Sequence, residues 1–306
     1  MGILSPIMSY IVGKEADFPS PSTKIKLNKV IGRYKLILRT FAYRYDIGEI
    51  KFGLADLYIG RNEPGDYKEA MKLYNDIIQK PTSPFLLARA LSGKAELFIS
   101  ENDKKKIEEG IELSRRAKKI LEEEVGKEDF FYQKSVIVEA ELLTKKGKKE
   151  DVKIAAKLYE SLIKSDQTNY YFRARAMIGI SELNTYTAKP KTLKKYADHC
   201  DSAIELLRFR PQDYFSIKAK MILVEVLTQI DSKKNVNRII QLCNQVLLNK
   251  YADKETIART RLDKADVSKK NNAEKLIAEV KKTEGLPDYI YKKAKLIEAD
   301  LKKRKK

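Results

Sequence analysis

Apolar residues recur along most of the chain at the spacing of one helical face, and the stretches that carry this pattern come in pairs. The clearest stretch runs from Gly65 to a stop at Pro81, and its apolar face consists of Tyr67, Ala70, Tyr74, Ile77 and Ile78. Gly65 is predicted to end the preceding helix, and Asp66 to cap the next one by accepting hydrogen bonds from its free N–H groups. Just upstream, the same spacing occurs in Phe52, Ala55, Tyr58 and Ile59. The pattern therefore predicts a helix hairpin.

This hairpin recurs with a fixed internal spacing. In three successive units, a small residue of the first helix precedes a small residue of the second by 15 positions, as in Ala55 and Ala70, Ala95 and Gly110, and Ala140 and Ala155. The units are offset by 40 and then 45 residues. A small residue is expected where two helix backbones cross closely, because the side chains at the crossing set the distance between the axes.

The same periodicity predicts three further hairpins, over residues 176–204, 217–247 and 257–280, and a last helix from Asp288 to Leu301 that closes the stack. Two apolar runs, 135–138 and 221–224, are also compatible with strands. Each lies inside a longer helical pattern, so helix is predicted for both. The expected fold is all-α: a right-handed α-solenoid of about five to six antiparallel helix hairpins. The expected organisation is an N-terminal arm (1–22), a helical repeat domain (23–301) and a basic tail (302–306).

The chain has a large positive net charge, and one of its segments has no acidic residue. The 62 lysines and arginines outnumber the 43 acidic residues, which gives a net charge of +19, and no acidic residue lies between Thr23 and Tyr45. The predicted first helix, 24–45, therefore has a basic surface that includes Lys24, Lys29, Arg33 and Arg39. A basic amphipathic helix can bind an anionic membrane or an acidic partner. We favour packing of its apolar stripe on the next hairpin, with its charges in water.

The sequence has few of the residues that carry chemistry. His199 is the only histidine, and the two cysteines, Cys200 and Cys243, are expected to be buried small hydrophobes. We find no phosphate-binding glycine loop, nucleophile elbow or metal-ligand motif, so we expect neither an enzyme nor a metal or cofactor. The chain also has no apolar run of the roughly 18 residues that a membrane span needs, and its start is a poor signal peptide. A cytoplasmic location is the default expectation.

The string Gly65-Asp66-Tyr67-x-x-Ala70-x-x-x-Tyr74-x-x-Ile77 resembles the second half of a tetratricopeptide repeat, and Ala55 and Tyr58 resemble its first half. The unit is longer than in that family, at 40 to 45 residues rather than about 34. The resemblance implies a scaffold whose concave face is lined by the first helix of each pair. That face holds a peptide or helix of a partner protein.

Carrying the concave positions over to this chain gives two rows. They are Glu49, Arg89, Lys134 and Arg173, and then Asp56, Glu96, Glu141 and Ile180, with Phe52, Ile59, Ile99 and Ile180 as apolar contacts. The charged members either contact a ligand or pair with one another between neighbouring helices, and both interpretations stay open. We expect a protein-interaction scaffold, with an acidic segment as one option for its partner. The alternatives are a basic helical-repeat nucleic-acid-binding protein and a peripheral membrane-associated assembly factor.

Overall fold

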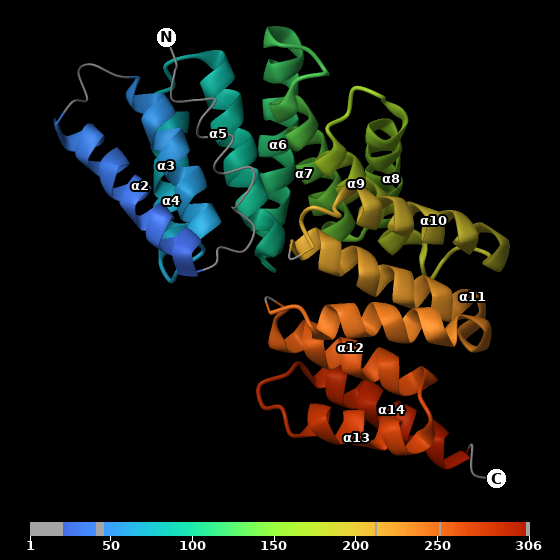
Figure 1. The fold of residues 1–306 in the computed structure, drawn as a ribbon. Helices are drawn as coiled ribbons and strands as arrows, with labels where there is room; N and C mark the ends of the chain where they lie inside the picture. Colours follow the sequence, from blue (N-terminus) through green and yellow to red (C-terminus); the bar gives the residue numbers. More distant parts are fainter. Residues whose placement is uncertain (1–20, 41–45, 212, 251, 304–306) are drawn as a thin grey trace. The chain divides into compact units, whose positions relative to one another are not determined.

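The computed structural model describes residues 21–40, 46–211, 213–250 and 252–303, which form helices joined by turns, with no strand among them (Figure 1). The chain divides into two compact units, Met1–Ala176 and Met177–Lys306. The prediction of an all-α fold is confirmed for these residues. The helices of unit 1 are α2 (Pro21–Thr40), α3 (Ile47–Arg61), α4 (Asp66–Gln79), α5 (Pro84–Leu97), α6 (Lys104–Glu124), α7 (Phe130–Lys146) and α8 (Lys149–Lys164). Helix α9 (Tyr170–Asn184) begins in unit 1 and ends in unit 2, which continues with α10 (Pro190–Leu206), α11 (Tyr214–Leu247), α12 (Lys254–Val267), α13 (Lys270–Lys281) and α14 (Asp288–Lys303).

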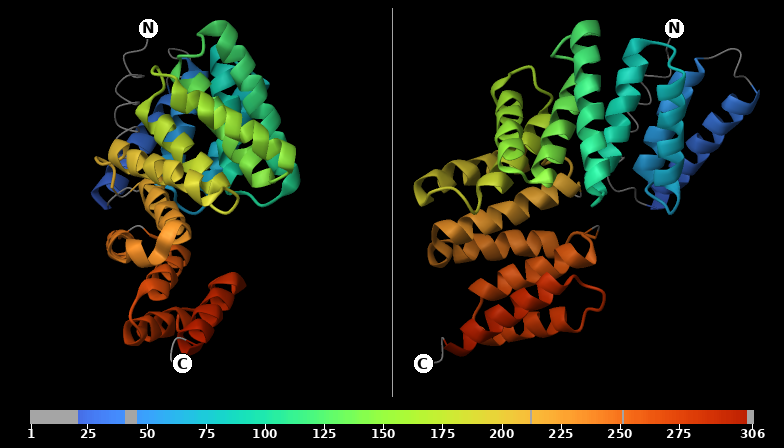
Figure 2. Two further views of the ribbon diagram at one scale, coloured as in Figure 1. Left: turned by 90° about the vertical axis from the view of Figure 1, so that its right-hand side faces the viewer. Right: turned by 180° about the vertical axis from the view of Figure 1, so that it is seen from behind.

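Within unit 1 each helix packs against the next along the chain (Figures 1 and 2). The pairs α3–α4, α5–α6 and α7–α8 are the three hairpins with the fixed spacing of small residues. Helix α3 also contacts α5, and α5 contacts α7, whereas α4, α6 and α8 approach one another less closely. The first helices of the pairs therefore lie on the inner side of the stack in unit 1.

The small residues lie at these helix crossings as predicted. Ala55, Ala70, Ala95, Ala140 and Ala155 are completely buried. A Cβ atom on their counterpart in α6, Gly110, would come within 2.8 Å of Leu142. The apolar runs at 135–138 and 221–224 are helical, in α7 and α11, because the longer helical pattern around each run outweighs its local β propensity.

The turn between α3 and α4 differs from the prediction. Asn62, in the left-handed conformation (φ 52°), ends α3, and Gly65 (φ 92°) is the N-cap residue of α4. Asp66 does not cap the helix. Its buried carboxylate instead accepts hydrogen bonds from the Arg61 guanidinium and from the backbone N–H of Glu63. Because the Asp66 carboxylate is bound by Arg61, it does not accept hydrogen bonds from the first N–H groups of α4.

Helix α2 begins at Pro21, so it includes the end of the segment that was predicted to be an arm. The predicted end of this helix, 41–45, lies outside the described residues, as does the side chain of Lys24. Leu27 and Ile31 are buried against α3 and α4, while Lys29, Arg33 and Arg39 are exposed. The apolar stripe of this basic helix therefore packs on the next hairpin.

Helix α11 is the predicted fifth hairpin. Asp231 interrupts it with an extended backbone (φ −170°, ψ 96°), and its carboxylate accepts hydrogen bonds from the N–H groups of Lys233 and Lys234. This cap starts the second half of the hairpin. Ile217, Met221 and Val246 from the two halves form one buried cluster, so the second half folds back on the first. Helices α12 and α13 form the sixth hairpin, and α14 packs on both of them.

Both cysteines are free and buried, as predicted. Burial raises the pKa of the Cys200 thiol to about 12 and that of the Cys243 thiol to about 12. Since only the thiolate is nucleophilic, neither is expected to react with an aromatic disulfide reagent at pH 8 while the protein is folded. Both should react fully after unfolding in urea. Rapid labelling of either cysteine in the folded protein would contradict this prediction.

Candidate functional site: a ladder of ion pairs on the first helices

Three ion pairs join the successive first helices of unit 1. In each pair an acidic residue of one first helix contacts a basic residue of the next. The pairs are Glu49 with Arg89, Glu96 with Lys134, and Glu141 with Arg175, at N–O distances of 2.7, 2.8 and 2.7 Å. We refer to these six residues as the inner ladder, because they lie on the helices that form the inner side of unit 1.

Arg175 connects two rungs of the inner ladder. Its guanidinium donates hydrogen bonds to both carboxylate oxygens of Glu141, at 3.1 and 2.7 Å, and to Glu96 at 3.2 Å. Burial alone would raise the pKa of Glu96, but the charges of Lys134 and Arg175 lower it to about 2. Glu96 is therefore ionised between two cations, and α5, α7 and α9 are held in one network.

Arg89 is held by aromatic rings as well as by charge. Its guanidinium carbon lies 4.1 Å from the ring centroid of Phe52 and 4.5 Å from that of Phe131, with Phe85 at 5.4 Å. One nitrogen, Nη1, donates to both carboxylate oxygens of Glu49. Cation–π contacts stabilise a desolvated guanidinium. The first rung therefore also packs α3, α5 and α7 together.

Beside the inner ladder, the hydroxyl of Tyr74 on α4 donates a 2.7 Å hydrogen bond to Asp56 on α3. Burial raises the pKa of Asp56, even though Lys134, Tyr74 and Arg89 act in the opposite direction. Among the described residues, no cation forms an ion pair with Asp56. It joins a first helix to its own second helix.

Unit 2 contains ion pairs of the same kind. Two of them join an acidic residue of one first helix to a basic residue of the next first helix, and the third joins α12 to the closing helix α14. The pairs are Glu182 with Lys218, Glu225 with Arg259, and Asp263 with Lys293. Because such ion pairs occur in both units, they are a regular feature of the helical repeat and are not confined to one place in the fold.

Two residues predicted for the groove in the fourth unit, Arg173 and Ile180, take no part in these ion pairs. Arg173 is not in the inner ladder; its guanidinium donates to the backbone carbonyl of Ser165. Ile180 is buried, and so is Phe52, which lies in the core of the first hairpins. The remaining apolar positions, Ile59 and Ile99, are half-buried.

The residues of the fourth unit that form the regular ion pairs are Arg175 and Glu182, and the sequence contains a signal for them. A basic residue precedes an acidic one by seven positions at 89 and 96, 134 and 141, 175 and 182, and 218 and 225. Seven positions are about two helical turns, so both side chains lie on one face. Aligning the units on small residues moved the fourth unit by two positions and hid this regularity.

The carboxylates of the inner ladder are more exposed than the cations that pair with them. The side chain of Glu49 is 41% exposed against 10% for Arg89, and that of Glu96 is 27% exposed against 14% for Lys134. An ionised carboxylate has about four acceptor positions, more than these pairs use. The inner face of unit 1 therefore presents unused hydrogen-bond acceptors, while its cations are largely buried.

The low pKa of Glu96 predicts an acid-labile network. Because its folded-state pKa lies below the unfolded value of about 4.5, its ion pairs stabilise the fold fully above that pH and are lost as the pH falls towards 2. We expect the loss to be on the order of 2 to 3 kcal/mol, and to be smaller in Glu96→Gln than in the wild type. Urea unfolding at several pH values measures it, with Glu123→Gln as an exposed control. Equal pH dependence in the wild type and Glu96→Gln would contradict the prediction.

No protein-family model matches this chain, and no match was found among curated proteins. Within the described helices, none combines the length and apolar character needed to cross a membrane. The same part of the chain contains no group of three or more histidine, cysteine or acidic side chains placed to hold a metal ion. The regular ion pairs of the first helices are thus the feature on which a functional proposal can be based.

Proposed function

We propose that the protein is a non-enzymatic scaffold of the tetratricopeptide type, which binds an extended or helical segment of a partner protein along the inner face of unit 1. The observation that carries this proposal is the pair of partly exposed carboxylates of Glu49 on α3 and Glu96 on α5, two of the helices that form the inner side of unit 1. The unused acceptor positions of these carboxylates suit a peptide that offers hydrogen-bond donors.

The exposed atoms of the inner ladder favour a basic partner segment. Arg89, Lys134 and Arg175 are occupied by carboxylates and have little exposed surface, so an acidic segment would meet Glu49 and Glu96 first. Like charges brought together at an interface reduce affinity, whereas complementary ones increase it and speed association. We therefore expect the partner segment to contain lysine or arginine, and not to be the acidic segment that the sequence left open.

Selection from a random peptide display library tests the proposal and requires no identified partner. The wild type should enrich peptides rich in lysine and arginine, and Glu49→Gln/Glu96→Gln should lose that enrichment. The matched control, Glu112→Gln/Glu160→Gln, removes two acidic side chains from the second helices α6 and α8 and should retain it. Acidic peptides, or equal enrichment by the wild type and the inner-face variant, would contradict the proposal.

A second candidate, binding to nucleic acid or an anionic membrane, is supported by α2. The side chains of Lys26, Lys29 and Arg33 are exposed, and the helix has no acidic residue. Electrostatic binding to nucleic acid weakens steeply with salt. Retention of mixed RNA or of anionic vesicles at low salt, lost in Lys29→Gln/Arg33→Gln, would favour this candidate.

A further inference from the structure

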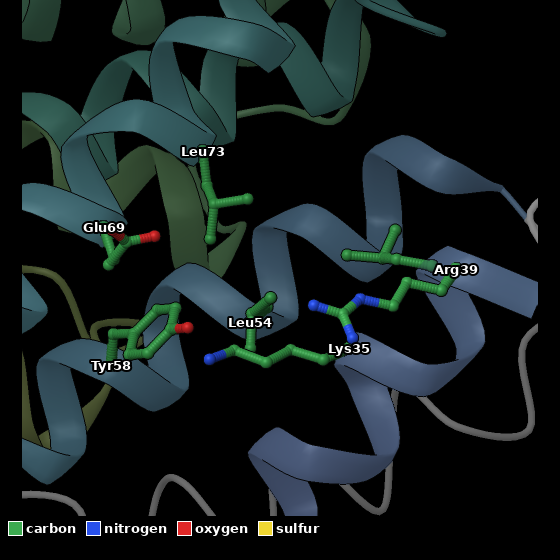
Figure 3. A pocket seen from close by; sticks show the side chains of 7 residues that line it. Lys35, Arg39, Leu54, Tyr58, Glu69 and Leu73 are labelled. Atoms are coloured by element: carbon green, nitrogen blue, oxygen red, sulfur yellow. The ribbon is translucent and has the colours of Figure 1, made fainter.

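A hollow of about 310 Å³ lies between α2, α3 and α4, and no residue of the inner ladder lines it. Its wall combines cations with aliphatic side chains (Figure 3). The lining residues are Lys35, Leu38, Arg39, Leu54, Tyr58, Glu69 and Leu73. A volume of this size is at the lower end of the range of small-molecule sites.

Two cations on α2 face this hollow. Lys35 and Arg39 are one helical turn apart, and Figure 3 shows both side chains extending towards Leu54 and Tyr58. The Lys35 ammonium lies 5.5 Å from the centroid of the Tyr58 ring. Within the described residues, no carboxylate forms an ion pair with either cation. Like charges one helical turn apart repel each other, and a bound anion would relieve that repulsion.

The rest of the wall determines what kind of anion fits. Leu38 from α2 and Leu73 from α4 are half-buried and supply the aliphatic surface of the hollow, while Leu54 beneath them is already buried. The hydroxyl of Tyr58 points towards the same space (Figure 3). A small inorganic anion would leave the exposed parts of Leu38 and Leu73 in water, whereas an aliphatic stem would cover them.

We propose that this hollow is a binding site for an aliphatic carboxylate, with the carboxylate at Lys35 and Arg39 and the stem on Leu38 and Leu73. Glu69, the only acidic residue among the described residues that line the hollow, opposes the ligand's charge and limits its affinity. The site is separate from the inner face of unit 1 and does not depend on the proposed scaffold function.

Calorimetric titration with octanoate tests the site. Octanoate should bind the wild type, octan-1-ol and inorganic phosphate should bind more weakly, and Lys35→Gln/Arg39→Gln should reduce octanoate affinity by about tenfold or more. The matched control is Lys68→Gln/Lys72→Gln, which removes two exposed cations at the same spacing from α4. It should bind octanoate like the wild type.

A second variant is expected to bind octanoate more tightly, a result that misfolding of the protein could not produce. Glu69→Gln replaces an exposed side chain and removes the unfavourable charge, so octanoate should bind it a few-fold more tightly than the wild type. The proposal is overturned if octanoate does not bind, if phosphate binds as tightly as octanoate, or if affinity is unchanged in both Lys35→Gln/Arg39→Gln and Glu69→Gln.

Discussion

Replacing Arg89 with alanine is expected to lower the free energy of unfolding of unit 1 by about 2 to 5 kcal/mol, the usual cost of truncating a large buried side chain to alanine. The change removes both hydrogen bonds to Glu49 and the packing of the guanidinium between Phe52 and Phe131. It also leaves a cavity where α3, α5 and α7 meet. Urea unfolding followed by circular dichroism measures the loss, and amide exchange in these three helices locates it.

The control for this prediction is Arg116→Ala, an exposed arginine on α6. It removes the same side chain from the surface and should change stability by no more than about 0.5 kcal/mol. A loss for Arg89→Ala as small as that of the control would mean that the rings and the ion pair contribute little. The inner ladder would then be a surface feature and not part of the core.

Alanine at Gly93 is expected to destabilise unit 1 by about 1 to 3 kcal/mol, as overpacking of a core usually does. A Cβ atom there would lie 2.5 to 2.8 Å from two ring carbons and the hydroxyl oxygen of Tyr74. That ring cannot move easily, because it is completely buried and its hydroxyl is bonded to Asp56. The expected sign is opposite to that of an ordinary helical Gly→Ala change, which favours the helix.

Gly32 gives the matched comparison. It lies within α2, and a Cβ atom there would meet no atom within 4 Å. Gly32→Ala should therefore stabilise the protein by up to about 1 kcal/mol. Thermal unfolding midpoints that shift in opposite directions for the two variants would support the close approach of α4 and α5. Stabilisation by alanine at both positions would contradict it.

The fold was predictable because it depends on local periodicity. The apolar stripes and the 15-residue spacing placed the hairpins, and the extended residue at Asp231 lies within the predicted fifth hairpin. The prediction that Asp66 caps α4 was wrong, because Arg61 binds the same carboxylate through a contact that sequence spacing alone does not reveal.

The candidate site was predictable only in part. Glu49, Arg89, Glu96, Lys134 and Glu141 were placed on the first helices, and the structure joins them in ion pairs. Whether the acidic or the basic side chain of a pair stays exposed depends on how deeply each one is packed, which the sequence does not show directly. The sequence was therefore compatible with an acidic partner, whereas the exposed carboxylates support our proposal of a basic one.

The rule that orders the ion pairs also bears on how such a chain can change in length. Between consecutive first helices, an acidic residue of the earlier helix pairs with a basic residue of the later one. The pairing therefore depends on the position of the charge in the helix and not on which two helices are neighbours. If α7 and α8 were deleted, Glu96 would face Arg175, which it already contacts at 3.2 Å. Loss or duplication of a hairpin would thus preserve opposite charges at the new junction. The ion pairs alone would therefore not oppose the gain or loss of a hairpin.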